Sequence, residues 1–416
     1  DRNGIPPLMS LMGCPMKIAI PKERRGNETR VAATPDTVKR MVGFADEVAV
    51  EKGAGLSSGI PDEAFEEAGA TIAKAAKETL DGADIVLKVR APLRKGEGRV
   101  DELAAMERGA VLLGLLDPYD SAEAIAAYAD AGVRAFAMEL VPRITRAQSM
   151  DVLSSQANLA GYRAIIDGAA EFGRAFPMLM TAAGTVPPAK VLVMGAGVAG
   201  LQAIATARRL GAVVSATDVR PAAKEQVESL GASFVAVEDD EFKEAETAAG
   251  YAREMSDAYK AKQAELIATT IAKQDLVICT ALIPGRPAPV LVTKEMVESM
   301  KPGSVLVDLA VERGGNCPLS KPDEIVEHGG VKIVGHTNLA GRISATATAM
   351  YAKNLLNFIT PLVDAEAKTL SIDWEDEIIA GSGLTRDGAV VHPNFTDAPP
   401  PAKEDEAAEE EAETKD

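Results

Sequence analysis

Residues 191–202 read VLVMGAGVAGLQ, and residues 213–218 read VVSATD. The first run is typical of an apolar strand that enters a tight glycine turn and then a helix, and the second of a strand that ends in a carboxylate. A strand, a GxGxxG turn, a helix and an acid about twenty residues further on form the unit that binds a dinucleotide. A tight strand-to-helix turn without a ligand is the alternative explanation of the glycines.

Three glycines and one acid have separate expected tasks in this unit. Gly195 permits the sharp turn, Gly197 lets the backbone approach a pyrophosphate, and Gly200 lets the helix pack closely on the strand. The N–H groups at the start of the helix favour phosphate. Asp218 is expected to accept hydrogen bonds from both ribose hydroxyls and to repel a 2′-phosphate, which favours NAD(H) over NADP(H). Arg220 can soften that repulsion, so the preference stays open.

Short apolar runs alternate with helical patterns in two series along the chain. The first series predicts strands at 17–20, 47–50, 85–89, 111–115 and 134–137, and the second at 190–194, 213–217, 233–237, 276–279, 304–309 and 332–334. Each series is typical of a doubly wound parallel sheet. We therefore predict an α/β protein of two doubly wound, Rossmann-like domains with a cleft between them.

The domain boundaries follow from a helical pattern at 345–359, after the second series is complete. This helix is expected to return to the first domain, which makes that domain discontinuous. The predicted domains are residues 16–143 plus 345–395, and a dinucleotide-binding domain of residues 144–344. Residues 1–15 are expected to be a disordered N-terminal extension, and their residue order is not that of a signal peptide. Residues 396–416 are acidic and almost free of apolar residues, which predicts a disordered tail.

Composition excludes several classes of protein. A net charge of −18 and a pI near 4.8 argue against binding nucleic acid or an anionic membrane surface. No apolar run approaches the roughly 20 residues that span a bilayer, so we expect no direct membrane insertion, although docking on a membrane-embedded partner stays open. The cysteines and histidines lie far apart and predict neither a disulfide framework nor a metal site: Cys14, Cys279, Cys317, His328, His336 and His392.

A dense polar run covers residues 143–162, between the two predicted sheets. Arg143, Gln148 and Asp151 supply a cation, an amide and an anion, a set that can hold a nicotinamide carboxamide in one orientation. A polar helix between domains is the other interpretation of this run.

Several further motifs stand beside this run: IPKE at 20–23, RVA at 30–32, GAGVAGLQA at 195–203, TALIPG at 280–285, ERGGN at 312–316 and GHTN at 335–338. With them the chain, from Met16 to about Phe395, closely resembles the NAD(H)-binding subunit, domain I, of proton-translocating nicotinamide nucleotide transhydrogenases. The sequence that follows GHTN differs in detail from the one more common in the family.

The resemblance implies roles for individual residues. Arg143, Gln148 and Asp151 match the loop that orients the nicotinamide at the hydride-transfer face, Ser154 matches a serine that contacts the nicotinamide side, and Tyr162 a nearby tyrosine. The remaining nucleotide contacts implied are the pyrophosphate backbone at Ala196, Gly197 and Val198, the adenosine ribose at Asp218, Val219 and Arg220, a mobile loop with Gly250 and Tyr251, and the adenosine side at Gln263 and Leu282. Local packing of a surface tyrosine is the alternative for Tyr251.

The resemblance also implies the reaction and the partners. A soluble subunit of this family binds NAD(H) and exchanges a hydride directly with NADP(H) on a separate component, while a membrane-spanning domain couples the Re/Si-specific transfer to proton translocation. The family subunit is a homodimer. We accordingly expect a cytoplasmic chain that is peripheral to the inner membrane through its partner subunits.

An alanine dehydrogenase is the nearest alternative, and a non-catalytic NAD-binding regulatory module is a third. Alanine dehydrogenases are similar in fold and share counterparts of Arg30 and Lys88, which would suit a substrate carboxylate. Such enzymes also need a proton donor and acceptor, a histidine just after the next strand. Residues 111–119 read VLLGLLDPY and contain no histidine. Hydride transfer between two nicotinamides needs none, so we interpret Arg30 and Lys88 as relics of the shared fold or as members of structural ion pairs.

Overall fold

The structure, a computed structural model, describes residues 15–243, 255–283 and 285–396. Its contacts divide the chain into two units. Unit 1 comprises the chain up to Arg25, Val31–Asp151 and the chain from Ala352, whereas unit 2 comprises Gly26–Arg30 and Val152–Tyr351. Each unit therefore has its own sheet and core.

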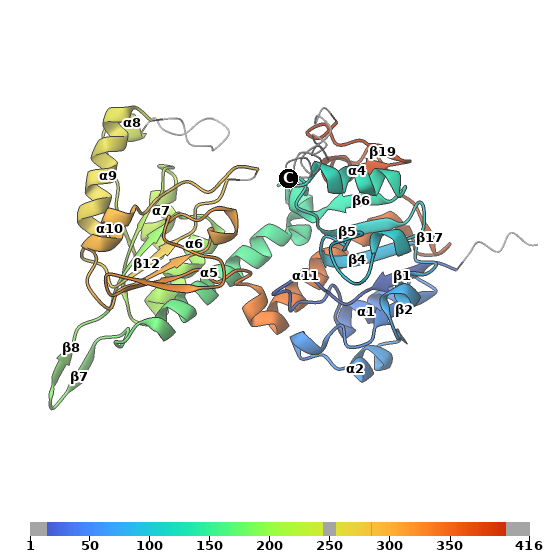
Figure 1. Cartoon of the computed structure of the whole chain (residues 1–416), viewed down its shortest axis with the longest axis horizontal. Coiled ribbons are helices and arrows are strands. Elements are labelled where there is room, and N and C mark those ends of the chain that lie inside the picture. The colour runs from blue at the N-terminus through green and yellow to red at the C-terminus, as the bar shows by residue number, and fades with distance from the viewer. Residues whose placement is uncertain (1–14, 244–254, 284, 397–416) are drawn as a thin grey trace, which may run out of the picture. The chain divides into compact units, whose positions relative to one another are not determined.

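Unit 1 contains a six-stranded parallel sheet with the order β3-β2-β1-β4-β5-β6. The central strands are apolar along their length because helices cover both faces of a doubly wound sheet. The chain reverses its winding direction between β1 and β4, the position at which doubly wound sheets open toward a ligand. The strands are β1 (Lys17–Ile20), β2 (Glu47–Glu51), β3 (Thr71–Ala73), β4 (Ile85–Arg90), β5 (Val111–Leu115) and β6 (Arg134–Ala137), and the helices α1 (Pro35–Met41), α2 (Asp62–Glu67), α3 (Ala76–Leu80) and α4 (Ala122–Asp130) (Figure 1).

The chain beyond Ala352 completes unit 1. Helix α11 (Ser344–Ile359) enters it, and β16 (Val363–Asp364), β17 (Thr369–Leu370), α12 (Glu377–Ser382), β18 (Thr385–Arg386) and β19 (Ala389–Val390) follow. At the β6 edge, the Thr385 hydroxyl donates to the Val133 carbonyl at 2.7 Å and accepts from the Ala135 N–H at 3.0 Å. The C-terminal segment thus covers the β6 edge of a sheet whose strands all come from the N-terminal part of the chain.

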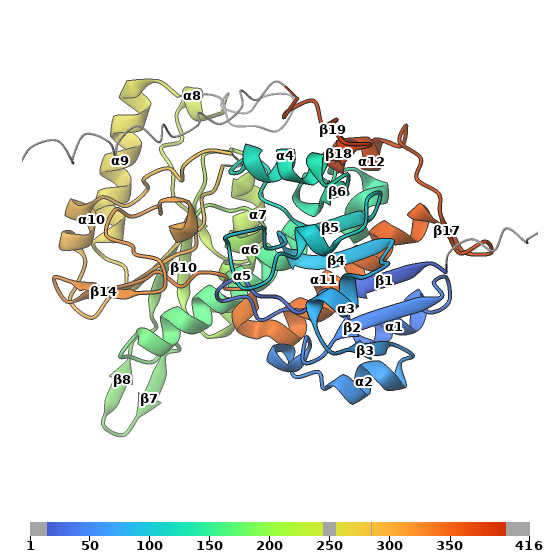
Figure 2. The same cartoon turned by 45° about the vertical axis from the view of Figure 1, so that its right-hand side comes forward.

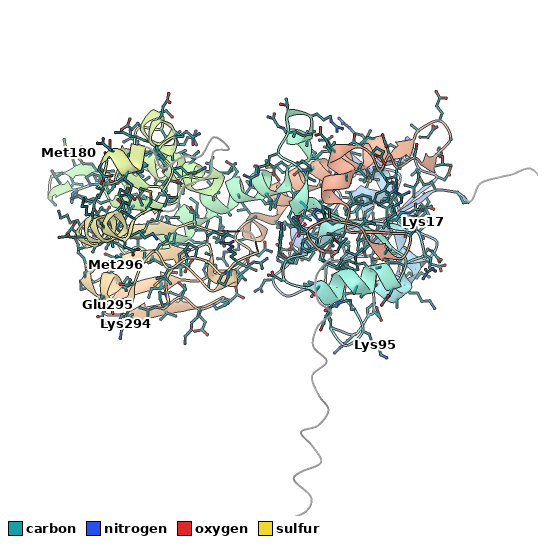
Figure 3. All side chains as sticks on the ribbon, turned by 90° about the horizontal axis from the view of Figure 1, so that it is seen from above. Lys17, Lys95, Met180, Lys294, Glu295 and Met296 are labelled. Carbon is teal, nitrogen blue, oxygen red and sulfur yellow. The ribbon has the colours of Figure 1, made fainter. Side chains whose placement is uncertain are left out.

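Unit 2 contains a seven-stranded sheet with the order β11-β10-β9-β12-β13-β15-β14, parallel except for the edge strand β14. Its strands are β9 (Lys190–Met194), β10 (Val213–Thr217), β11 (Ser233–Phe234), β12 (Leu276–Cys279), β13 (Val305–Asp308), β14 (Ile325–His328) and β15 (Val331–Val334). The helices named below are α5 (Val152–Glu171), α6 (Val198–Arg209), α7 (Ala223–Ser229), α9 (Asp257–Ile271) and α10 (Lys294–Ser299); α10 begins with Lys294, Glu295 and Met296, which are labelled in Figure 3.

A two-stranded hairpin of β7 (Leu179–Thr181) and β8 (Gly184–Val186) extends away from the rest of unit 2 (Figures 1 and 2). Its side chains do not join a core: Met178 is 58% exposed, Leu179 42% and Met180 78%. Met180 is labelled in Figure 3. Three consecutive exposed apolar side chains are unusual on a solvent-facing hairpin.

The prediction of a doubly wound, Rossmann-like α/β fold is confirmed. Two strands were predicted too long. Residues 304–309 form a strand only at Val305–Asp308, and residues 233–237 only at Ser233–Phe234, since the Val237 N–H donates to a side chain of α9 instead of a neighbouring strand. Among the described residues, no helix is both long and apolar enough to span a bilayer. The predictions for residues 1–14 and 397–416 lie outside the described residues.

Candidate nucleotide-binding site

The glycine turn after β9 is fixed by close contacts. Gly195 has φ +102°, and a Cβ atom there would lie 2.4 Å from the Thr280 hydroxyl oxygen. A Cβ on Gly200 would lie 1.8 Å from the Gly195 carbonyl oxygen, so only glycine allows α6 to start this close to the turn. A Cβ on Gly197, in contrast, would meet no atom within 4 Å. The backbone at the start of α6 therefore faces open space, which fits the approach of a pyrophosphate.

Asp218, at the end of β10, is already engaged by its own chain. One carboxylate oxygen accepts the Ala196 N–H at 2.7 Å, and the other accepts the Arg220 N–H and the Arg220 Nε–H, both at 2.9 Å. Burial alone would raise the pKa of Asp218, but the hydrogen bonds from Arg220 and Ala196 hold that pKa below its ordinary value. Asp218 is thus ionised and paired with Arg220, the residue that sequence reasoning singled out as able to soften its charge.

The carboxyl ends of three neighbouring parallel strands, β10, β9 and β12, lie next to one another at the same end of the unit 2 sheet. The Thr280 hydroxyl after β12 donates to the Gly195 carbonyl at 3.0 Å and joins two of these ends. Three exposed apolar side chains lie on the segments that follow the strands: Val198, Val219 and Leu282. Apolar walls beside a few fixed polar groups are typical of a nucleotide pocket, and all three residues were predicted contacts.

Through Gln263, helix α9 joins the end of β10 to the segment that follows β11. The Gln263 amide oxygen accepts the Val237 N–H at 2.9 Å, and its amide nitrogen donates to the Thr217 hydroxyl at 3.3 Å. The Tyr259 hydroxyl donates to the Val237 carbonyl at 3.1 Å. In this structure Gln263 therefore supports the end of β10. The predicted residues Gly250 and Tyr251 lie outside the described residues.

Sequence reasoning gave no role to Asn316, which is fully buried. Its amide oxygen accepts the Ala281 N–H at 3.1 Å, and its amide nitrogen donates to the carbonyls of Ala281 at 2.9 Å and Pro289 at 2.8 Å. These bonds hold the segment before Leu282. The only signal in the sequence was its place in the ERGGN motif.

The predicted nicotinamide-orienting residues lie in unit 1, on and beside the 3-10 turn η4 (Thr145–Met150). Arg143 and Gln148 are exposed, and Asp151 is half-buried at the end of the turn. Within the part of the chain that the structure describes, the side chains of Arg143 and Gln148 have no hydrogen bond or ion pair. Ser154 lies in the first turn of α5, which belongs to unit 2, as does the exposed Tyr162.

Comparison with protein families agrees with this geometry. Residues 19–160 match the N-terminal domain of the alanine dehydrogenase/PNT family, and residues 164–393 match its C-terminal domain. The chain belongs to the alanine dehydrogenase/PNT family.

Three relatives within the alanine dehydrogenase/PNT family match at least 90% of this chain. The chain is 60% identical over 381 residues to an NAD(P) transhydrogenase subunit alpha polypeptide of Rhodospirillum rubrum, covering 92% of this chain and 99% of the relative. A solved transhydrogenase from Sinorhizobium meliloti matches with a TM-score of 0.81 and 57% identity, covering 90% and 100% of the two chains. An L-alanine dehydrogenase structure matches with a TM-score of 0.73 and 28% identity, covering 91% and 98%.

Two buried cations bear on which activity of the alanine dehydrogenase/PNT family this chain has. Lys88 Nζ lies 3.0 Å from Glu102 Oε2 and 3.3 Å from Glu23 Oε2 in unit 1. Arg30 in unit 2 makes two hydrogen bonds to Glu28, at 2.8 and 2.7 Å, and one to Gln156 at 2.8 Å. Both cations are therefore matched by carboxylates of the chain itself, in agreement with the ion-pair interpretation.

A buried carboxyl group lies beside the segment that follows β5, a segment without a histidine. The Asp117 N–H, after β5, donates to Glu139 Oε1 at 2.6 Å. Burial, with a smaller contribution from the nearby charge of Asp117, raises the pKa of Glu139 to about 7. The second oxygen of Glu139 is buried and has no hydrogen-bond partner among the described residues. Sequence reasoning missed this group because nothing in the pattern marks Glu139 as buried.

No group of three metal-ligating side chains (His, Cys, Asp or Glu) occurs in the described ranges. Cys279 and Cys317 are both buried thiols, and burial raises the pKa of each. Cys14 lies outside those ranges.

Proposed function

We propose that this chain is the NAD(H)-binding component of a proton-translocating NAD(P) transhydrogenase. The observation that carries the proposal is the 60% identity to a transhydrogenase alpha subunit across 99% of that relative. The glycine turn with its open approach at Gly197 and the ionised Asp218 support binding of a dinucleotide by this chain. NADP(H) would then be bound by a partner component, and a separate membrane-spanning domain would couple the transfer to proton flow.

The chain's own residues bind and orient; they do not exchange protons with the reacting carbon. We propose that Arg143, Gln148, Asp151 and Ser154 hold the nicotinamide with its hydride-transfer face toward the partner's nicotinamide. The free side chains of Arg143 and Gln148 support this role, since neither is used within the described protein. Correct placement of two reactants supplies much of the rate of such a transfer.

The remaining elements of the proposal concern assembly. Subunit names of the relatives indicate a complex of several subunits. We propose a homodimer that associates with the membrane through its partner subunits on the cytoplasmic side. The exposed apolar hairpin supports a protein contact of this kind.

A mixing assay tests the proposal directly. The chain is combined with a separately produced NADP(H)-binding component, and reduction of an NAD+ analogue by NADPH is followed. Transfer that requires both proteins is the expected result. NADH binding without any transfer would reject the proposal.

Gln148→Asn tests the orienting role. The shorter side chain shifts the amide by about one bond length, and small misplacements of reacting atoms are costly. We expect the transfer rate to fall by at least about tenfold while the Kd for NADH stays within about twofold. The measurements are stopped-flow transfer and fluorescence titration with NADH. Weaker binding at an unchanged transfer rate would contradict the assignment.

Alanine dehydrogenase activity is the second candidate. The observation that favours it is Glu139 beside β5, whose pKa burial raises to about 7. It predicts NADH oxidation by the chain alone when ammonia and pyruvate are supplied. A binding module without catalysis predicts NADH binding and no transfer to either acceptor.

A further inference from the structure

The residues proposed to orient the nicotinamide lie on and beside the turn η4. The hydrogen bonds within this turn stabilise it only weakly. A 3-10 turn has poorer hydrogen-bond geometry than an α-helix. Only Ala147 and Met150 are buried among its six residues. A cavity of about 50 Å³ lies against it, lined by Arg146 and Met150 of the turn, Phe358 of α11 and Ile378 of α12. Apolar packing therefore leaves the turn incompletely supported.

Two asparagines of α11 bind the turn at a single backbone atom. The side-chain amides of Asn354 and Asn357 both donate to the carbonyl oxygen of Ser149, at 2.8 and 3.0 Å. Residues three apart lie on one face of a helix, and two donors use both lone pairs of the carbonyl. Ser149 directly follows Gln148, so these bonds fix the peptide next to the proposed orienting amide.

An ion pair holds the other side of the turn. Arg146 donates to both carboxylate oxygens of Asp376, at 2.7 and 3.0 Å. Asp376 is itself fixed because it caps α12 by accepting the Ile378 N–H at 2.8 Å. The hydrogen bond from Arg146 lowers the pKa of Asp376, so the pair is charged at neutral pH. A bidentate pair restricts orientation as well as distance.

The side chains and peptides along the turn differ in whether the rest of the protein holds them. Arg146 and Ser149 are anchored, whereas the side chains of Arg143 and Gln148 are free of bonds to the described protein. We propose that Asn354, Asn357 and the Arg146–Asp376 pair are positioning residues that hold the turn so that Arg143 and Gln148 are presented to the nicotinamide. This inference rests on the proposed function and extends it to Arg146 and to three residues outside the 143–151 loop.

The test compares Asn354→Ala/Asn357→Ala, Arg146→Ala and Arg146→Lys in the complete chain. The matched control is Lys353→Ala, an exposed residue of the same helix. Three quantities are measured: the transfer rate to the NADP(H)-binding component at saturating nucleotide, the Kd for NADH, and hydrogen exchange of the amides at 145–151. Arg146 is about half-exposed, so its variants keep the test valid even where the double variant folds poorly.

We expect the double asparagine variant and Arg146→Ala to lower the transfer rate by about tenfold and to speed exchange at 145–151, with the Kd for NADH within twofold. Arg146→Lys, which keeps the charge but loses the fork of two bonds, should give an intermediate rate. Lys353→Ala should match the wild type. Unchanged transfer in the variants, with active wild type, would overturn the positioning role, and so would unchanged exchange. An inactive wild type would instead reject the proposed function.

Discussion

At the scale of single residues, the pairing of Asp218 with Arg220 determines which polar groups are available to a nucleotide at the proposed site. The carboxylate that is expected to accept the ribose hydroxyls already accepts four hydrogen bonds from the chain, three of them from Arg220. A ribose bound as we propose would therefore share Asp218 with the guanidinium or displace it. The arginine sets both the charge and the availability of the acid.

Arg220→Ala removes the side-chain bonds and leaves those from the two backbone N–H groups. Because burial raises the pKa of Asp218 and Arg220 lowers it, the pKa of Asp218 should rise in the variant. Binding that needs the ionised form should then be lost at a higher pH as the solution is acidified. We also expect stronger rejection of NADPH, since the compensating cation is gone.

Fluorescence titrations with NADH and NADPH from pH 4.5 to 8 measure both effects. Arg209→Ala, on α6 and away from the acid, serves as the control for loss of one positive charge. An NADH affinity with the wild-type pH dependence would show that Arg220 does not govern Asp218.

The residues of this site could be predicted from the sequence where they lie close together along the chain. The glycine turn and the acid at the end of the next strand lie within 30 residues of each other, and the structure places them on one sheet edge. The supporting contacts were not predictable, because they join distant segments of the chain. Arg146 and Asp376 are 230 residues apart, and Ser149 and Asn354 are 205 residues apart. No spacing rule connects such pairs.

At the scale of elements, α5 and α6 of unit 2 cross at unusually close range. A Cβ atom on Gly161 of α5 would lie 2.0 Å from the carbonyl oxygen of Ala199 in α6. Because the obstacle is backbone, a rotamer change cannot relieve the clash. The same helix α6 begins at the glycine turn, so a shift of α6 moves the proposed pyrophosphate site.

Gly161→Ala should therefore weaken both the fold and the binding of NADH. We expect the free energy of unfolding to fall by about 3 kcal/mol, at the upper end of the usual cost of overpacking, and the Kd for NADH to rise several-fold. Urea unfolding and NADH titration measure the two. Gly173→Ala, where a Cβ would meet nothing within 4 Å, is the matched control and should change stability by less than about 0.5 kcal/mol. Wild-type stability of the Gly161 variant would show that the helices can separate without cost.

Elements buried on both faces were predicted well, and exposed or very short ones were not. Strands such as β5 and β9 read as continuous apolar runs because the sheet is covered on both sides. The hairpin of β7 and β8 was missed since it has no buried face. Strands β16 to β19 have two residues each and depend on pairing with their neighbours. Local pattern carries no information about such pairing.

At the scale of the whole molecule, the exposed hairpin of unit 2 is the feature that calls for a partner surface. Met180→Lys places a charge on this hairpin, and if the hairpin packs against the second chain of the proposed homodimer, burying that unpaired charge is unfavourable. We expect the dissociation constant of the dimer to rise by at least about tenfold. Sedimentation velocity over a range of protein concentrations measures it. Ala182→Lys, in the turn of the same hairpin, controls for the added charge, and an unchanged dimer in the Met180 variant would assign the contact elsewhere.

The hydrogen bonds of Thr385 to the β6 edge of the unit 1 sheet have a consequence for protein synthesis. The partners of Thr385, Val133 and Ala135, leave the ribosome 252 and 250 residues earlier. At roughly 5–20 residues per second, this interval lasts about 12–50 s. Throughout it the edge of β6 has unpaired backbone groups, which are prone to pair with other chains, whereas the strands of the unit 2 sheet all lie within the continuous segment Val152–Tyr351. Nascent chains of this protein therefore need protection at β6 longer than at any strand inside unit 2.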